Sequence, residues 1–200
     1  MVEAMPYPKS FTMPVPGTRK SIQPTEQENE RMIYPIVKFG DPVLEAPAAT
    51  VTVFDSDLKT LVADMFESMY AAQGVGLAAP QIGVSKRIAV VDVTFKEDPS
   101  QKLVLINPEI IHSEGKQSGN EGCLSLPEFR EHVTRPNRVT VRAQDEHGTW
   151  HEHTGEELLA RAFLHETDHL NGKLYITHIS GLKRDFMKRK IKKLMRAGEW

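Results

Sequence analysis

Residues 165 to 169 read His-Glu-Thr-Asp-His, and this run constrains the chain more than any other stretch. Residues four apart on an α-helix lie one turn above each other, so His165 and His169 would present two imidazole rings to the same point. Two neutral imidazoles at that spacing can bind a transition metal. Glu166 follows the first histidine directly and can contact a water there without being a ligand itself. The pattern therefore predicts a metal centre built on one helix.

The flanking residues indicate that this helix exists. Thr154-Gly155-Glu156-Glu157 has the form of an N-cap followed by a capping-box glutamate, and Asn171-Gly172 supplies a C-terminal stop. Several apolar side chains lie on or beside the stripe that carries the histidines, namely Leu158, Leu159, Ala162, Phe163 and Leu170. We therefore expect a buried helix whose chemical groups point into the protein.

Two histidines are an incomplete ligand set, because a catalytic tetrahedral site takes three protein ligands and keeps one position open. The same spacing also arises by chance on exposed helices. The long zinc-protease pattern needs a histidine where this chain has Tyr175, and nothing in the setting of His178 favours it instead. The single cysteine, Cys123, lies in a predicted glycine-flanked loop. A lone cysteine is most often a small buried apolar residue, but its thiolate would complete a Cys-His-His set.

Composition is that of one globular domain. The chain has 200 residues, of which 40% are hydrophobic and 26% are charged, enough for a sizeable core. A net charge of -2 gives no general attraction to DNA or to a membrane, and no apolar run is long enough to cross a bilayer. One cysteine excludes an intrachain disulfide, and the N-terminus lacks the apolar core of a secretory signal. We expect a soluble cytoplasmic protein.

Residues 1–31 differ in composition from the rest of the chain. They are rich in proline, lack apolar periodicity and end in a charged run. Such a segment cannot bury enough apolar surface to offset the entropy of ordering it. We therefore predict a flexible N-terminal extension over residues 1–31 and a single catalytic domain over residues 32–200. Met32 is an alternative start that the sequence does not decide.

Apolar periodicity predicts the other elements. Helical spacing over residues 55–72 indicates a first helix, capped by Asp55 or Ser56. Four β-rich runs predict strands, over residues 88–93, 103–106, 139–143 and 149–153. Between the first helix and the first strand, the small residues of Gly74–Gln81 let the backbone pass close to a substrate or a neighbouring strand.

A final helix is expected over residues 181–197. It carries eight basic residues against one acid, Asp185: Lys183, Arg184, Lys188, Arg189, Lys190, Lys192, Lys193 and Arg196. A solvated face on a packed terminal helix explains this charge as well as a functional role does. The functional alternative is docking on an anionic partner such as ribosomal RNA.

Three stretches together resemble the signature motifs of the peptide deformylases. They read G-x-G-L-A-A-P-Q at residues 74–81, E-G-C-L-S at 121–125 and H-E-x-D-H at 165–169. The resemblance runs from about Met32 to the basic terminal helix, and the compact spacing is similar to that of the bacterial type I enzymes. It implies an α+β fold in which small antiparallel sheets pack around the metal-binding helix, with a helix at the C-terminus. The implied reaction removes the formyl group from N-terminal formyl-methionine of nascent polypeptides and releases formate.

The resemblance also implies a role for each matching residue. The metal ligands would be Cys123, His165 and His169, with Glu166 as general base. The Gln81 amide and the Leu124 backbone N–H would bind the formyl oxygen. The residues expected to contact substrate are Val75, Gly76, Arg130, Leu158 and Ala162. A supporting ion pair would join Glu121 and Arg135. The implied metal is Fe(II), although the ligand set alone also accepts zinc, nickel or cobalt.

Three alternatives remain at this point. A zinc peptidase shares H-E-x-x-H, a cysteine hydrolase would use Cys123 as a nucleophile, and a non-catalytic ribosome-binding protein would use only the basic terminal helix. The chain also departs from the family pattern at Glu128, where many relatives carry glycine, and in residues 1–31. Oligomeric state and the preference for residues after methionine are not readable from the sequence.

Overall fold

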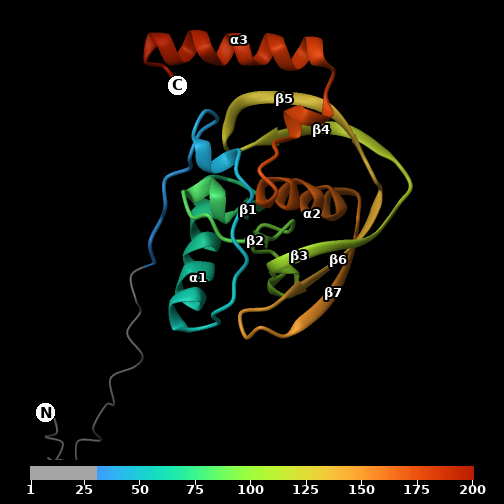
Figure 1. The fold of residues 1–200 in the computed structure, drawn as a ribbon. Helices are drawn as coiled ribbons and strands as arrows, with labels where there is room; N and C mark the ends of the chain where they lie inside the picture. Colours follow the sequence, from blue (N-terminus) through green and yellow to red (C-terminus); the bar gives the residue numbers. More distant parts are fainter. Residues whose placement is uncertain (1–30) are drawn as a thin grey trace, which may run out of the picture. The chain divides into compact units, whose positions relative to one another are not determined.

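A helix, α2 (Glu157–Leu170), runs between two antiparallel sheets at the centre of the protein (Figure 1). The structure is a computed structural model that describes residues 31–200. The expected α+β class, with antiparallel sheets around a central helix, is confirmed. The predicted flexible extension falls on residues 1–31, of which residues 1–30 lie outside the described part. In that part no helix combines the length and apolar character needed to span a membrane.

The larger sheet has five strands in the order β1-β2-β3-β6-β7, and every neighbouring pair is antiparallel. Its strands are β1 (Gly76–Ala78), β2 (Ile88–Val91), β3 (Leu103–Glu114), β6 (Arg138–Gln144) and β7 (Trp150–Glu156). The smaller sheet pairs β4 (Gln117–Cys123) with β5 (Leu126–Arg135). Short 3-10 turns complete the chain, at η1 (Pro42–Leu44), η2 (Ala79–Ile82), η3 (Pro99–Gln101) and η4 (Tyr175–His178).

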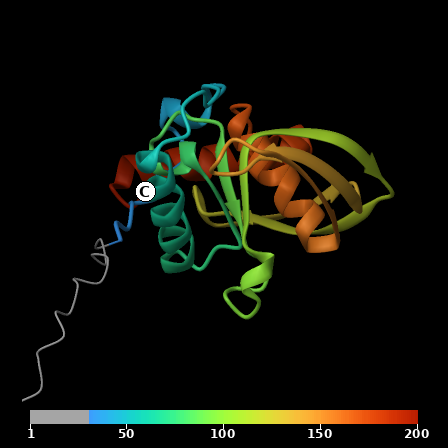
Figure 2. The same ribbon diagram turned by 90° about the horizontal axis from the view of Figure 1, so that it is seen from below.

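The larger sheet separates two hydrophobic clusters, one on the side of α1 (Ser56–Ala71) and one on the side of α2. Successive side chains of a strand point to opposite faces, so Ile88 and Val90 belong to the first cluster and Ala89 and Val91 to the second. This two-sided burial explains why β2 reads as a continuous apolar run. The loop between β2 and β3 projects from the body of the protein (Figure 2).

The helix predicted over residues 55–72 is confirmed as α1. Its N-cap is Asp55, whose carboxylate accepts a hydrogen bond from the Leu58 backbone N–H at 2.9 Å. This bond satisfies one of the amide groups left open at a helix start. Leu58, Val62, Met65 and Met69 form one buried face of this helix.

The start of α2 differs from the prediction. Thr154 is not its cap, because it belongs to β7, where its hydroxyl lies 2.9 Å from the Thr140 hydroxyl of β6. The helix begins at Glu157, which adopts φ +50° and donates its N–H to the Asn137 carbonyl at 2.9 Å. Pairing with β6 extends β7 to Glu156 and so takes up the residues that a capping box would need.

The end of α2 is where the sequence placed it. Asn171 is the C-cap, and Gly172 follows with φ +69°, the left-handed conformation that ends many helices. A β-carbon on Gly172 would also come within 2.7 Å of the Glu45 carbonyl oxygen. Arg87 of the loop before β2 donates to the Leu170 carbonyl at 3.2 Å and to the Asn171 side chain at 2.9 Å. The motif of residues 165–169 therefore lies on a helix that is anchored at its C-terminal end.

Neither strand of the smaller sheet, β4 or β5, was among the strands predicted from apolar patterns. The β4 segment reads Gln-Ser-Gly-Asn-Glu-Gly-Cys and contains no β-branched or aromatic residue, so its pattern does not predict a strand. It is held by β5 and by a hydrogen bond from Gln117 Nε2 to the Glu157 carbonyl at 2.7 Å. Cys123 is therefore the last residue of a strand, and its assignment to a loop was wrong.

The last helix, α3 (Gly181–Ala197), has the bounds predicted for it. Its buried residues Met187 and Ile191 pack into a third cluster with Leu126 and Val133 of β5 and with Tyr175 of η4. The rest of α3 is largely exposed and lies on the outside of the smaller sheet (Figure 1).

Candidate metal centre

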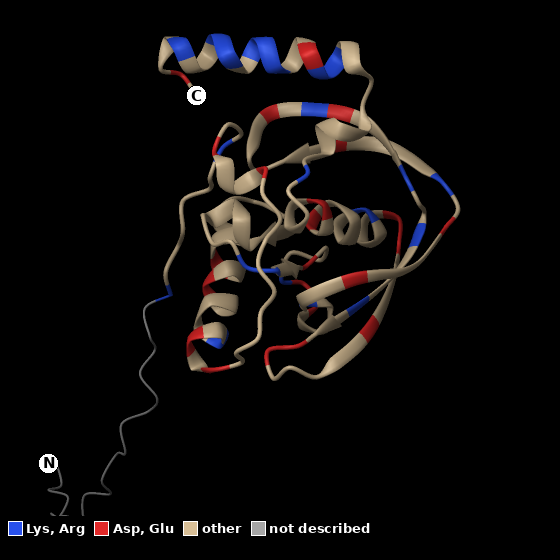
Figure 3. Ribbon diagram, viewed as in Figure 1, with Lys and Arg blue, Asp and Glu red and all other residues tan. Residues whose placement is uncertain are grey.

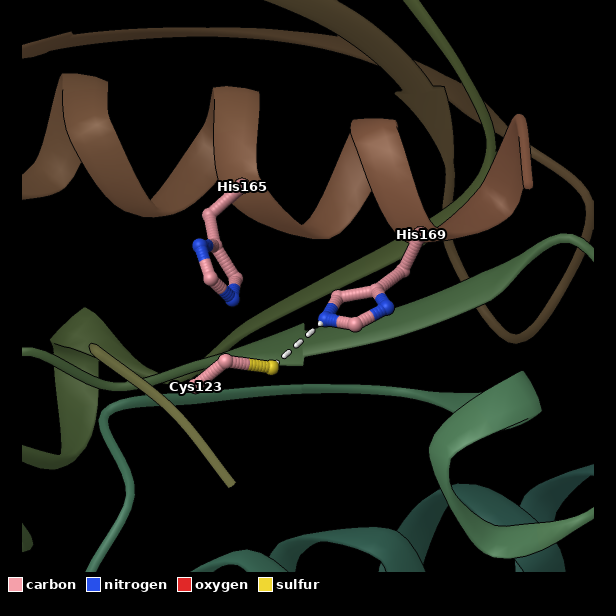
Figure 4. Close-up of side chains that lie close together, drawn as sticks. All are labelled: Cys123, His165 and His169. Carbon is pink, nitrogen blue, oxygen red and sulfur yellow. Dashed lines mark hydrogen bonds between the residues drawn. The ribbon is translucent and has the colours of Figure 1, made fainter. Parts of the chain in front are cut away.

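Cys123, at the end of β4, meets His165 and His169 of α2 (Figure 4). One ligand atom from each residue lies within 4.8 Å of the other two, and Cys123 Sγ is 3.2 Å from His169 Nε2. The two imidazole rings share one helix face, with centroids 5.0 Å apart. The convergence that the sequence predicted from helical spacing and a distant cysteine is therefore present in the fold.

Glu121, two residues before Cys123, orients the first histidine. Its Oε1 lies 2.8 Å from His165 Nδ1, so that nitrogen carries the proton and Nε2 is left to bind a metal. Arg135 of β5 donates two hydrogen bonds to the same carboxylate, at 2.6 and 3.1 Å. Burial works to raise the pKa of Glu121, but the hydrogen bonds from His165 and Arg135 outweigh it and hold the pKa far below its ordinary value. The Glu121 side chain is therefore ionised at neutral pH.

The donor set fits a divalent transition metal. A thiolate with two imidazoles is a ligand combination found for such ions. Burial lowers the pKa of His169, which leaves the neutral ring that metal binding requires. Burial also opposes charge on His165, yet the Cys123 sulfur and the Glu121 carboxylate raise its pKa well above the ordinary value. The surroundings of His165 thus favour positive charge at this point, and a bound cation would provide it.

Glu166 lies beside this centre with its carboxylate buried. The residue is 3% exposed, and its Oε2 has no hydrogen-bond partner among the described side chains. Burial raises the pKa of Glu166 to about 7, in the range suited to a group that exchanges protons at neutral pH. Its carboxylate packs directly against Gly76 of β1.

The side-chain amide of Gln81 offers its N–H groups toward the same place. The Gln81 Oε1 accepts from the Ala78 backbone N–H at 2.9 Å, so its amide nitrogen is directed at Cys123 Sγ, 3.6 Å away, and at Ser125 Oγ, 3.4 Å away. Leu124 follows Cys123, and its side chain packs against Gly74. A β-carbon on Gly74 would lie only 2.9 Å from Leu124 Cδ1. The small residues of the 74–81 stretch thus permit close approach to side chains of the site.

A cavity of about 530 Å³ opens onto these groups. All residues expected to contact substrate line it: Val75, Gly76, Arg130, Leu158 and Ala162. Five residues with expected chemical roles line it too: Gln81, Leu124, Cys123, His165 and Glu166. His169 is fully buried behind them. The fold thus brings every predicted site residue to one cavity or to its wall.

Comparison with known proteins shows the family. The family model for polypeptide deformylase matches residues 33–185. The curated peptide deformylase of Acidobacterium capsulatum is 63% identical over 169 residues, covering 84% of this chain and 99% of the relative. The chain belongs to the polypeptide deformylase family. Members of this family are metal-dependent hydrolases that remove the formyl group from N-formylmethionine. This excludes the zinc peptidase and the purely non-catalytic ribosome-binding protein as alternatives.

Solved deformylase structures agree with this assignment. A crystal structure from Legionella pneumophila matches with a TM-score of 0.77 and 46% identity, covering 84% of this chain and 98% of its own. One from Synechococcus elongatus, in complex with actinonin, matches with a TM-score of 0.74 and 37% identity, covering 80% and 86%. The deformylase fold therefore accounts for most of the described residues.

Part of the hydrogen-bond network behind this site was not predicted from the sequence. Arg161 donates to Glu121 Oε2 at 2.7 Å, and its position four residues before His165, on a buried helix face, was a usable signal. Asp168 accepts from Arg135 NH1 at 2.7 Å and lies 2.8 Å from His178 Nε2. No sequence pattern predicted these two contacts, which join residues of α2, β5 and η4.

One departure from the family pattern, Glu128, has a backbone conformation that is uncommon for residues other than glycine. Glu128 has φ +67°, in the left-handed region that favours glycine, the residue that the family resemblance led us to expect there. Its side chain is exposed at the cavity rim.

Proposed function

We propose that this deformylase acts on N-formylmethionyl nascent peptides at one divalent metal ion held by Cys123, His165 and His169. The observation that supports this is the approach of one sulfur and two ring nitrogens to within 4.8 Å, in a cavity that the carboxylate of Glu166 also lines. A divalent ion bound there would lower the pKa of a water toward neutrality and polarise the formyl carbonyl. The remaining chemistry falls to side chains of the chain itself.

Glu166 is the proposed proton carrier. Its carboxylate accepts a proton from the attacking water and returns it to the nitrogen that leaves as the formyl C–N bond breaks, so that formate and a free amine result. Two features support this role: the side chain is buried next to the proposed ligands, and Oε2 is uncommitted among the described residues.

Gln81 and Leu124 are the proposed donors to the formyl oxygen. Negative charge develops on that oxygen during attack, and fixed N–H groups stabilise it without having to reorganise. The Gln81 amide is suited to this because its oxygen is already occupied by the Ala78 N–H, which fixes the nitrogen toward the site. Leu124 would contribute its backbone N–H from the residue next to Cys123.

Selectivity is assigned to the cavity walls. Val75, Leu158 and Ala162 would form the apolar pocket for the unbranched methionine side chain, and all three line the cavity. Gly76 and Arg130 would hydrogen-bond the peptide backbone. A formyl group is small, so a narrow cleft can exclude larger acyl groups by shape.

The test is formate release from a formyl-methionyl tripeptide, with the acetyl-methionyl tripeptide as control. Cys123→Ala should lose both the metal and the activity, and chelation should abolish wild-type turnover. A Cys123→Ala protein that keeps one equivalent of metal would refute the ligand set. Turnover that survives chelation would favour the cysteine nucleophile instead. We also expect actinonin, present in the Synechococcus elongatus structure, to inhibit the metal-loaded enzyme.

The working metal is proposed to be Fe(II). A thiolate beside ferrous iron is prone to oxidation, so the iron enzyme should lose activity faster in air than under argon. Protein loaded with nickel or zinc, ions the same ligands accept, is the matched control and should keep its activity equally in both atmospheres. Equal half-lives for the iron form would contradict iron as the oxygen-sensitive cofactor.

Association with the ribosome is proposed for α3. Figure 3 shows basic residues along most of this helix, and Leu182 and Phe186 add exposed apolar surface. Reversing charge at three exposed positions, Arg189, Lys193 and Arg196, should weaken co-sedimentation with ribosomes and leave tripeptide hydrolysis unchanged. Unchanged co-sedimentation would leave α3 as a solvated helix. We place the enzyme in the cytoplasm with nascent chains as substrates, and expect no DNA or membrane partner.

The domain organisation remains a proposal, with residues 32–200 as the catalytic domain and residues 1–31 as an extension. The match of the family model to residues 33–185 supports it. A protein that begins at Met32 should hydrolyse the tripeptide at the rate of the full chain.

A further inference from the structure

The carboxylate of Glu121 accepts four hydrogen bonds, and one comes from a residue with no assigned role. Oε1 accepts from Arg135 at 2.6 Å and from His165 at 2.8 Å. Oε2 accepts from Arg135 at 3.1 Å and from Arg161 at 2.7 Å. An ionised carboxylate offers about four lone-pair sites, so Glu121 is saturated. Arg161 is 8% exposed and Glu121 is 3% exposed, so little water is available to replace a lost partner.

Arg161 and Glu121 link the same two elements that carry the proposed metal ligands. Cys123 follows Glu121 by two residues on β4, and His165 follows Arg161 by four residues on α2. Two residues of strand advance by about 6.6 Å and four residues of helix by about 6 Å. Glu121 contacts Arg161 and His165, and Cys123 contacts His169, so the contacts follow one another in the same order along β4 and α2, and the Arg161–Glu121 contact lies just before the proposed ligands.

The Arg161 guanidinium is fixed by further contacts on the smaller sheet. It donates to the Val133 carbonyl of β5 at 3.2 Å and to Gln117 Oε1 of β4 at 3.3 Å. Gly119 leaves room for it, since a β-carbon there would come within 3.4 Å of Arg161 NH2. A planar guanidinium with several donors can hold these acceptors at once, which a lysine ammonium on its flexible chain does less well.

We propose that Arg161 is a positioning residue of the metal centre: it fixes α2 against β4 and keeps Glu121 on His165 Nδ1. Arg135 of β5 reaches α2 at Asp168, at 2.7 Å and beyond His165 in the sequence, whereas Arg161 joins Glu121 to α2 directly, one turn before His165. Without Arg161, α2 would keep His165 as its single side-chain link to Glu121 among the described contacts. The inference rests on the metal centre proposed above.

Cobalt(II) is the probe, because its visible absorption reports ligand geometry and thiolate coordination without any turnover. Arg161→Met removes the donors and keeps an unbranched chain, and Arg161→Lys keeps the charge. Arg138→Met is the matched control, since Arg138 is an exposed β6 residue. Arg161→Met should bind cobalt(II) about 10- to 100-fold more weakly, the usual range for loss of a residue behind the ligands, with an altered spectrum. The cobalt(II) affinity of Arg161→Lys should lie between those of Arg161→Met and the wild type, and Arg138→Met should have the wild-type affinity and spectrum.

Each result of this experiment either supports or overturns the positioning role of Arg161. A folded Arg161→Met protein, judged by far-UV circular dichroism, that has wild-type cobalt affinity and spectrum would overturn the proposal. If that variant does not fold, Arg161→Lys decides: weaker binding with a changed spectrum supports the proposal, and wild-type values overturn it. Absence of cobalt binding by the wild type would overturn the metal centre itself, a result distinct from an unaffected variant.

Discussion

The carboxylate of Glu166 occupies the space that a β-carbon on Gly76 would need. The backbone of Gly76 does not require glycine, since its φ is not in the left-handed region. The requirement comes from the approach of the two elements, because β1 is held by β2 through the pairing of Gly76 with Val91 and cannot move away freely. One methyl group at residue 76 therefore acts directly on the proposed general base.

Gly76→Ala should displace the Glu166 carboxylate and lower kcat by at least about 10-fold, part of the 10²- to 10⁴-fold effect of a general base. The metal content should not change, since the three atoms nearest to a β-carbon at residue 76 all belong to Glu166 and not to a proposed ligand. Gly181→Ala is the control, because the nearest atom to its β-carbon is the end of the Arg184 side chain at 3.7 Å. Undiminished turnover in the Gly76 variant would mean that Glu166 can move without loss.

Glu166→Gln should keep the metal and lose turnover. The amide has nearly the shape of the carboxylate but cannot accept the proton, so kcat should fall by about 10²- to 10⁴-fold. Steady-state formate release and metal analysis on the same preparation give the two values. Glu152→Gln, on an exposed strand position of β7, provides the matched change. Full activity of the Glu166→Gln variant would mean that another group acts as the general base.

Helices were the most predictable part of this fold. Apolar spacing and turn residues located α1 and α3, and they located the end of α2 at Asn171 and Gly172. These signals are local, because a cap or a glycine stop acts within one turn of the helix. The start of α2 was not predictable in the same way, since Thr154 is taken up by strand pairing with β6.

The proposed ligand set could be read from residue types, whereas the contacts behind it could not. A thiolate and two imidazoles are chemically recognisable, and helical spacing aligns His165 with His169. The β4 strand is polar and lacks strand-forming residues, so nothing local placed Cys123 or Glu121 beside α2. The contact of Arg161 with Glu121 depends on that long-range packing, and it became visible only in three dimensions.

The proposed methionine pocket makes a prediction about substrate affinity. Ala162 is 5% exposed and lines the cavity, so Ala162→Trp should fill the pocket and raise KM for formyl-methionyl peptides by about 10-fold or more. Ala162→Leu is a milder version that tests the same wall if the larger ring prevents folding. An unchanged KM in both variants would show that the side chain of the substrate binds elsewhere.

A buried pair outside the proposed ligand set gives a pH-dependent prediction for stability. The Tyr70 hydroxyl donates to Asp92 Oδ2 at 2.6 Å, and Asp92 is fully buried. Burial works to raise the pKa of Asp92, but hydrogen bonds from Tyr70, Thr94 and Lys96 outweigh it and lower the pKa to about 2. A carboxyl whose pKa is lower in the folded than in the unfolded chain stabilises the fold above its ordinary pKa. That contribution is lost as pH falls toward 2.

Tyr70→Phe should therefore lower the free energy of unfolding by about 1.5 to 3 kcal/mol at pH 7, the range for a hydrogen bond to a charged group. The difference from wild type should stay constant down to about pH 5 and narrow below pH 4, because Asp92 then begins to bind a proton in the folded variant, which lacks the Tyr70 hydrogen bond, while it stays ionised in the folded wild type. Urea unfolding of metal-free protein between pH 3 and 7 measures it. Tyr34→Phe is the control, since the Tyr34 side chain makes no hydrogen bond within residues 31–200. A Tyr70→Phe difference that is as large at pH 3 as at pH 7 would show that the contribution comes from packing of the ring and not from the ionised Asp92.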